Sequence, residues 1–178
     1  MSGGATRIFG LAGWSGSGKT ALVTRLVPAL IARGITVSTV KHAHHDFDID
    51  QPGKDSWKHR QAGASEVLVS SARRWALMHE HRGAREPGLA ALITHMSPVD
   101  LVLVEGFKHE AYPKLEIHRP AIGKPLLCID DPEIVAVAAD EPVAGLPVPL
   151  LPLDDETAIA AFIIAHCRLE VVHGAIER

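Results

Sequence analysis

The octapeptide GWSGSGKT at residues 13–20 matches the phosphate-binding pattern G-x-x-x-x-G-K-[ST] at every fixed position. Its three glycines let backbone N–H groups turn inward around phosphate oxygens, in conformations that a Cβ would hinder. Lys19 is then expected to reach the β and γ phosphates, and the Thr20 hydroxyl is expected to bind Mg²⁺. The octapeptide therefore predicts a nucleoside triphosphate site formed by Gly13, Gly16, Gly18, Lys19 and Thr20.

The segments on either side of the octapeptide supply the strand and the helix that such a loop requires. Residues 6–12 (TRIFGLA) form a short apolar run suited to a buried strand, and apolar residues recur at helical spacing through residues 21–33. Pro28 is expected to kink that helix, and Gly34 stands where a left-handed cap would end it. The order of strand, loop and helix supports the interpretation of the octapeptide as a phosphate loop.

Apolar runs alternate with amphipathic segments along the rest of the chain. Strands are predicted at residues 35–40, 67–70, 75–79, 100–105, 115–118, 126–129 and 134–138, and helices at residues 87–96 and 154–168. Asp154 is the expected cap of the last helix. This alternation indicates an α/β fold like that of the P-loop NTPases, with a mostly parallel sheet and helices on both faces. Residues 1–178 are expected to form a single P-loop domain, because no linker or repeat interrupts them.

One acidic residue follows a buried strand on the expected ligand edge of the sheet. Ligands of parallel α/β sheets sit at the carboxyl ends of the strands, and phosphoryl chemistry on Mg²⁺ needs an acid at such a position. The run DLVLVE ends at Glu105, whereas Asp100 stands at its start. We therefore assign Glu105 to the metal or to the attacking water, and interpret Asp100 as a solvent-exposed residue at the strand entry.

Residues 41–56 (KHAHHDFDIDQPGKDS) combine three histidines with four acids directly after a predicted strand. One interpretation is a switch loop beside the triphosphate, whose acids, Asp48 among them, bind Mg²⁺. The other is a transition-metal site, for which suitable donors are His42, His44, Asp46, Asp48 and Asp50. The segment contains no cysteine and lacks the usual zinc spacing, which favours the switch loop.

Composition limits the classes of partner. The net charge is −3 with histidine neutral, and lysine and arginine are scattered along the chain, so no nucleic-acid partner is expected. No signal sequence or apolar run of membrane-spanning length occurs, so no membrane partner is expected. Cys128 and Cys167 lie far apart in apolar stretches, which favours reduced thiols in the cytoplasm over a disulfide.

Five motifs in order resemble the molybdopterin-guanine dinucleotide biosynthesis protein B family, MobB. They are GWSGSGKT, KHAHHDFDIDQPGKDS, RQAGA at residues 60–64, RRWALM at residues 73–78 and LVEGFKHE at residues 103–110. The resemblance extends over residues 7–168 and is far more specific than the phosphate loop alone. It implies a GTP-binding, Mg²⁺-dependent protein that assists guanylyl attachment to molybdopterin. It also implies a homodimer and a partner, the guanylyltransferase of the pathway, with molybdopterin itself as a further candidate partner.

The resemblance also assigns individual residues. It implies that phosphate is bound by Ser15, Gly16, Ser17, Gly18, Lys19 and Thr20. Glu105 belongs to the Mg²⁺ side, so Lys19 and Glu105 are the expected catalytic residues of a weak GTPase. The chain has no NKxD or TKxD string to read guanine, and Asp140, at a predicted strand end, is the candidate to pair with guanine N1 and N2.

Trp14 departs from a wider group of related dimeric phosphate-loop proteins. Some of those proteins carry a lysine at the second loop position that reaches across the dimer, so slow hydrolysis is expected here. Two alternatives stay open at this point. A small-molecule kinase would need a lid built from Arg73, Arg74, Arg82 and Arg85. A metal-delivery protein would use the histidine-rich segment.

Overall fold

The computed structural model describes residues 5–43, 47–107 and 110–171, and the chain divides into two compact units. The first unit comprises Met1–His42 with Ser97–Arg178, and the second comprises Ala43–Met96. The first unit carries the phosphate loop, and the second carries the pair of strands predicted within residues 67–79. The single P-loop domain expected over residues 1–178 stays a prediction.

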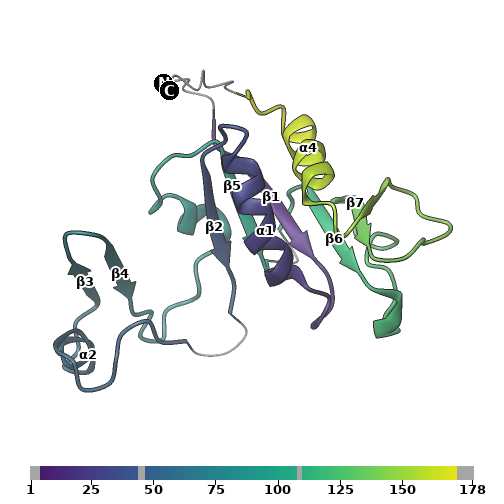
Figure 1. The fold of residues 1–178 in the computed structure, drawn as a ribbon. Helices are drawn as coiled ribbons and strands as arrows, with labels where there is room; N and C mark the ends of the chain where they lie inside the picture. The colour runs from purple at the N-terminus through teal and green to yellow at the C-terminus, as the bar shows by residue number, and fades with distance from the viewer. Residues whose placement is uncertain (1–4, 44–46, 108–109, 172–178) are drawn as a thin grey trace. The chain divides into compact units, whose positions relative to one another are not determined.

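The first unit is built on a six-stranded sheet in which every pair of neighbouring strands is parallel (Figure 1). The order is β2-β5-β1-β6-β7-β8. Its strands are β1 (Arg7–Ala12), β2 (Val37–Lys41), β5 (Leu101–Glu105), β6 (Lys114–His118), β7 (Ile134–Ala139) and β8 (Leu150–Pro152). Its helices are α1 (Lys19–Ile31) and α4 (Glu156–Cys167), with a 3₁₀ turn, η1 (Pro120–Ile122). The carboxyl ends of these strands therefore meet at one edge, where ligands of such sheets bind.

Helices α1 and α4 cover the same face of this sheet and pack against each other (Figure 1). Phe9 of β1, Leu22 of α1 and Ile159 of α4 are fully buried between the layers. Val137, on the opposite face of β7, packs in a cluster with loop side chains that include Leu127. The mostly parallel sheet is confirmed, and loops cover the second face at β7 where helices on both faces were predicted.

The second unit contains a two-stranded antiparallel sheet and two short helices. Its elements are α2 (Asp55–Gln61), β3 (Glu66–Ser70), β4 (Trp75–His79) and α3 (Leu89–Ile93). The hairpin agrees with the predicted pair of strands. Helix α3 is shorter than the predicted helix at residues 87–96. The N–H groups of Thr94, His95 and Met96 each donate to the carbonyl three residues earlier, so tight turns replace the last helical turn.

The strand predicted at residues 126–129 is wrong. These residues form a turn, because the fully buried Glu116 carboxylate accepts hydrogen bonds from the N–H groups of Leu127 and Cys128, each 2.9 Å long. These N–H groups therefore bond to a side chain and not to a neighbouring strand. Strand β8, which the sequence analysis did not predict, completes the sheet inside the proline-bearing stretch before α4.

The caps of α1 and α4 agree with the sequence at one helix and differ from it at the other. Gly34 has a φ of +79°, as predicted after α1. The cap of α4 is Asp155 and not Asp154: Asp155 Oδ1 accepts a 2.8 Å hydrogen bond from the N–H of Ala158. Ala158 N–H is one of the donors that the first helical turn leaves without a helical partner, so the residue one position later satisfies it.

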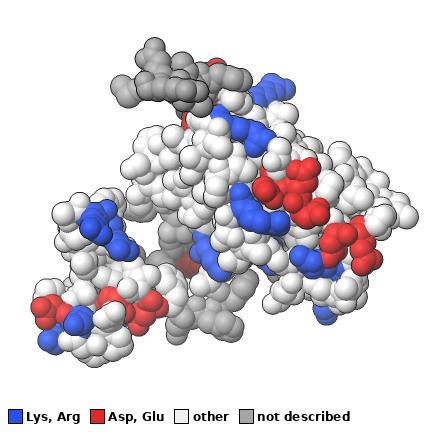
Figure 2. Space-filling model, in the orientation of Figure 1, with Lys and Arg blue, Asp and Glu red and all other residues white. Residues whose placement is uncertain are grey.

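No helix within the described residues is long and apolar enough to cross a membrane. Basic and acidic side chains lie interspersed on the face of the first unit that Figure 2 shows, without a stripe of a single sign.

The free thiols of Cys128 and Cys167 are buried, and burial raises the pKa of each to about 11.

Candidate functional site

The phosphate loop, residues 13–18, joins the carboxyl end of β1 to the first turn of α1. Its glycines adopt positive φ values, +144° at Gly13, +81° at Gly16 and +97° at Gly18. A Cβ on Gly13 would lie 2.6 Å from the carbonyl oxygen of Ile117 and 2.7 Å from Ser17 Oγ. The loop is therefore pressed against β6, and only glycine fits at its first position.

Lys19 folds back over this loop. Its Nζ donates hydrogen bonds to the carbonyl oxygens of Gly13, at 2.9 Å, and of Trp14, at 3.0 Å. The ammonium group thus lies beside the loop backbone, at the start of a thirteen-residue helix whose positive dipole end faces the same region. Both features favour the binding of an anion there.

The phosphate loop contains a buried hydroxyl group, that of Ser17. Its side chain is 1% exposed, and its Oγ has no hydrogen-bond partner among the described residues. An unsatisfied buried hydroxyl costs about 1–3 kcal/mol. A phosphate oxygen held in the loop would provide the missing acceptor, so the residues present fit the predicted triphosphate.

Thr20 and Glu105 meet across the gap between α1 and β5. Thr20 Oγ1 lies 3.5 Å from both carboxylate oxygens of Glu105. The parallel register pairs Glu105 with Leu11 of β1 on one side and Lys41 of β2 on the other, which fixes it at the ligand edge. The structure therefore brings together two of the three predicted Mg²⁺ ligands.

Asp100 lies at the opposite end of β5, as predicted, but it has a structural contact that the sequence analysis missed. Its Oδ2 accepts hydrogen bonds from the backbone N–H of Thr36, at 2.8 Å, and from Thr36 Oγ1, at 2.6 Å. These bonds lower the pKa of the Asp100 carboxyl group below 3.8. The residue ties the start of β2 to the start of β5.

Arg119 is the residue at this edge that the sequence analysis overlooked. It follows the last residue of β6, and its Nε donates a 3.1 Å hydrogen bond to the carbonyl oxygen of Ser17 in the phosphate loop. Its Nη1 is paired with the carboxylate of Asp140, which follows β7. The predicted Asp140 is thus linked to the phosphate loop through one guanidinium group.

Trp14 occupies the second position of the loop. Its indole N–H donates a 2.8 Å hydrogen bond to the carbonyl oxygen of Pro125, and Lys124 Nζ lies 5.5 Å from the centre of its ring. Trp14 therefore anchors the phosphate loop to the segment that follows β6. This contact gives the second position of the loop a structural role.

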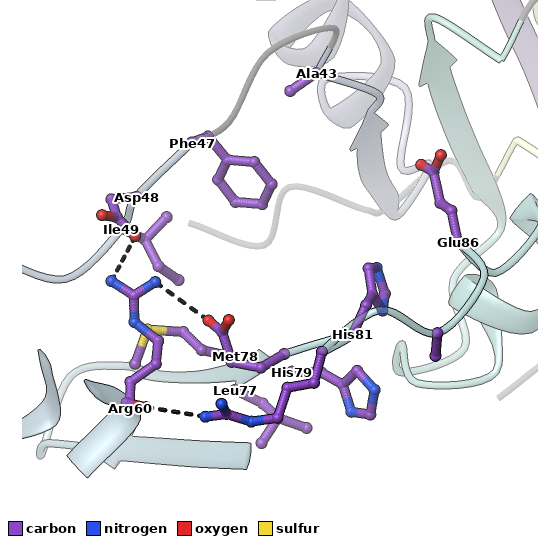
Figure 3. Close-up of a pocket in the computed structure, with 13 residues that line it drawn as sticks. Ala43, Phe47, Asp48, Ile49, Arg60, Leu77, Met78, His79, His81 and Glu86 are labelled. Atoms are coloured by element: carbon purple, nitrogen blue, oxygen red, sulfur yellow. Dashed lines mark hydrogen bonds and ion pairs between the residues drawn. The ribbon is translucent and has the colours of Figure 1, made fainter. Parts of the chain in front are cut away.

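The acids of the histidine-rich segment that the structure describes lie in the second unit. Arg60 Nη2 pairs with Asp48 at 2.6 Å (Figure 3). The same Nη2 pairs with Asp50 at 2.8 Å, and Arg60 Nη1 pairs with Glu80 at 3.2 Å. Hydrogen bonding to Glu80, together with the two aspartates, raises the pKa of Arg60. A pocket of about 970 Å³ lies beside these groups, with Phe47 and other side chains of the second unit in its wall. Asp48 is therefore engaged with Arg60, whereas Thr20 and Glu105 meet in the first unit.

The structure tests the transition-metal interpretation in part. No group of three histidine, cysteine, aspartate or glutamate side chains suited to a metal ion exists among residues 5–43, 47–107 and 110–171. His44, His45 and Asp46 lie outside the described residues. The four arginines that a kinase lid would need, Arg73, Arg74, Arg82 and Arg85, all lie in the second unit.

Comparison with known proteins shows which family this chain resembles. The family model for "Molybdopterin guanine dinucleotide synthesis protein B", MobB, matches residues 8–140. A protein of Escherichia coli (strain K12) named molybdopterin-guanine dinucleotide biosynthesis adapter protein is 45% identical over 160 residues, which is 88% of this chain and 91% of the relative. A protein of the same name from Haemophilus influenzae is 45% identical over 76% of each chain.

Solved structures agree with these relatives. A crystal structure of molybdopterin-guanine biosynthesis protein B has a TM-score of 0.70 at 29% identity and covers 89% of this chain and 99% of its own. A MobB homologue from Bacillus stearothermophilus has a TM-score of 0.63 at 27% identity, over 90% of this chain and 97% of its own. Sequence match, phosphate loop and fold lead to the same assignment, and the chain belongs to the MobB family.

Proposed function

We propose that this chain is a GTP-binding accessory protein of molybdopterin guanine dinucleotide biosynthesis, which assists the guanylyltransferase of that pathway in the cytoplasm. The observation that carries the proposal is the meeting of Lys19, Thr20 and Glu105 at one edge of the sheet around a glycine-lined phosphate loop. The names of the two bacterial relatives, which are adapter proteins of this biosynthesis, support the accessory role.

In this proposal the backbone of the loop holds the triphosphate of GTP. The residues involved are Gly13, Ser15, Gly16, Ser17, Gly18, Lys19 and Thr20. Thr20 and Glu105 are near enough to hold one Mg²⁺ ion, directly or through water. When bound, Mg²⁺ neutralises charge that develops on the β and γ phosphates. Asp48 is the third proposed ligand, and it would have to leave Arg60 to bind the ion.

Hydrolysis by the isolated chain should be slow. Glu105 orients water or metal and Lys19 stabilises charge, but the one arginine at the loop, among the residues the structure describes, is already bonded to Ser17 and Asp140. Without an arginine free to stabilise the transition state, a rate of about 10⁻⁴ to 10⁻² s⁻¹ is expected. A nucleotide that persists for minutes or longer suits a protein whose bound state is read by a partner.

We also propose a homodimer that uses the exposed face of the β3–β4 hairpin. Leu68 and Leu77 are cross-strand partners, and Trp75 lies two residues before Leu77 on the same face. The exposed fractions of these side chains are 60%, 39% and 61%. An apolar face of this kind on a two-stranded sheet is typical of a surface that another chain covers.

The accessory role is tested by reconstitution. Purified guanylyltransferase of the same organism would be given molybdopterin and GTP with Mg²⁺, with and without the chain, and formation of the dinucleotide would be followed. We expect wild-type chain to raise the yield or rate, and Lys19→Ala to have no such effect. Equal stimulation by both forms would contradict a role for the nucleotide site in assistance.

A further inference from the structure

The two sides of the phosphate loop differ in chemistry. On one side of β1, β5 ends at Glu105, which faces Thr20, the proposed metal-binding side of the site. On the other side, β6 and β7 end next to Arg119 and Asp140. In the proposed site Thr20 and Glu105 hold the metal and with it the β and γ phosphates, which leaves the side of β6 and β7 for the nucleoside end of a bound nucleotide.

Arg119 is held in place at this second side from two directions. Its carbonyl oxygen accepts a 3.0 Å hydrogen bond from Ile122 in η1, which fixes its backbone at the end of β6. Its Nε bonds to the carbonyl oxygen of Ser17, and its Nε and Nη2 would each lie 3.6 Å from a Cβ built on Gly18. The guanidinium group therefore lies against the phosphate loop where α1 begins.

Asp140 is the partner of this guanidinium group. Its carboxylate pairs with Arg119 through Oδ2, and its side chain remains 34% exposed. An ionised carboxylate only accepts hydrogen bonds, and guanine presents adjacent donors at N1 and at the N2 amino group. Adenine presents an acceptor at N1 and no amino group at C2. A carboxylate fixed at this position therefore favours guanine over adenine.

We infer that Arg119 and Asp140 form the base end of the nucleotide site, in which Asp140 accepts from guanine N1–H and the N2 amino group while Arg119 positions its carboxylate against the phosphate loop. The inference rests on the proposed function, because it assumes that the loop binds a nucleoside triphosphate. Asp140 contacts the base directly, and Arg119 is a positioning residue.

Binding of four triphosphates to the wild-type chain gives the first test. Calorimetry with GTP, ITP, XTP and ATP, each with excess Mg²⁺, keeps the phosphate contacts constant and changes only the base. ITP lacks the N2 amino group, and XTP places a carbonyl oxygen there. We expect GTP to bind about 10- to 100-fold more tightly than ATP, which loses the whole bidentate base contact. GTP should also bind more tightly than ITP and XTP, which keep N1–H and lose the N2 half of that contact. Equal affinity for GTP and ITP would overturn the inference.

Two substitutions distinguish direct contact with the base, proposed for Asp140, from positioning of that carboxylate, proposed for Arg119. Asp140→Asn should weaken GTP and strengthen XTP, because an amide donates to the C2 carbonyl oxygen of xanthine. Arg119→Ala should lower the GTP to ATP preference, a ratio that a general loss of fold would leave unchanged. Glu141→Gln, at the next position, is the matched control and should keep the wild-type order. An Asp140→Asn chain with the wild-type GTP to XTP ratio would overturn the base contact.

The same titrations distinguish a failure of this inference from a failure of the proposed function. A wild-type chain that binds all four triphosphates equally, with binding lost in Lys19→Ala, would leave the phosphate site standing and remove the base site. A wild-type chain that binds none of them would overturn both.

Discussion

At the scale of single residues, the proposed site gives the phosphate loop with Lys19 one role and Glu105 another. In this proposal the loop backbone and Lys19 bind phosphate whether or not a carboxylate is present, whereas Glu105 lies where a metal or a water would be oriented. Binding and hydrolysis should therefore depend on different side chains.

Glu105→Gln is expected to slow Mg²⁺-dependent hydrolysis much more than it weakens GTP binding. The amide keeps the size of the side chain and loses the charge that holds the ion. Single-turnover hydrolysis beside calorimetric binding measures the two effects, and Glu170→Gln serves as a control for the loss of one negative charge. Equal losses in binding and hydrolysis would give Glu105 a structural role.

Asp100 gives a prediction about stability and pH. Its pKa is lowered in the folded chain by hydrogen bonds from Thr36, so its contribution is complete above the unfolded pKa and is lost as pH falls through the folded pKa. Asp100→Asn should cost about 1 kcal/mol near neutral pH. Denaturant unfolding of wild type and variant should show this difference shrinking in acid, below the ordinary carboxyl pKa of 3.8. A difference that is constant with pH would contradict the assignment.

The residues of the phosphate loop could be predicted because phosphate chemistry dictates a fixed local pattern. The position of Glu105 at the ligand edge could be predicted because a single acid ends a buried strand there, whereas its role at the metal stays a prediction. Arg119 could not, because its contact with Ser17 joins positions 102 residues apart and depends on β6 lying next to β1. Contacts of this kind follow from strand order, which the local pattern does not contain.

At the scale of elements, long apolar runs were predicted best. Strands β1, β5 and β7 lie where continuous apolar segments occur, because both faces of a parallel sheet are covered. Residues 126–129 were assigned wrongly, because they are apolar for a different reason. Leu127 packs on the sheet as part of a turn whose N–H groups bond to Glu116. An apolar run alone does not distinguish these two cases.

The cap of α4 provides a test at this scale. Asp155→Ala should destabilise the fold by about 1 kcal/mol, because it removes the acceptor of the Ala158 N–H at the start of a helix that packs on the core. Asp154→Ala is the matched control and should change stability by a few tenths of a kcal/mol at most, which is typical of surface substitutions. Denaturant unfolding monitored by circular dichroism compares them. Equal losses in the two variants would contradict the assignment of Asp155 as the cap.

At the scale of the whole molecule, the proposed homodimer depends on the hairpin of the second unit. Replacing Leu68 and Trp75 together by serine should shift the chain from dimer to monomer, because it removes the two most exposed apolar side chains of that face. Ile129→Ser, which changes an equally exposed residue of the first unit, should leave the dimer intact. Sedimentation over a range of concentrations measures this. A double variant that remains a dimer would place the interface elsewhere.

The central claim is that the loop at residues 13–20 is a GTP site, and calorimetric titration with GTP and Mg²⁺ tests it most directly. Lys19→Ala removes a charged contact from a loop otherwise made of backbone donors, where hydrogen bonds to charged groups contribute about 1.5–3 kcal/mol each. Lys58→Ala, at an exposed ion pair of the second unit, controls for the loss of a positive charge. We predict that the wild type and Lys58→Ala bind GTP alike and that folded Lys19→Ala binds it about 10- to 150-fold more weakly, which can put binding below detection. Unchanged GTP affinity in folded Lys19→Ala would contradict the claim.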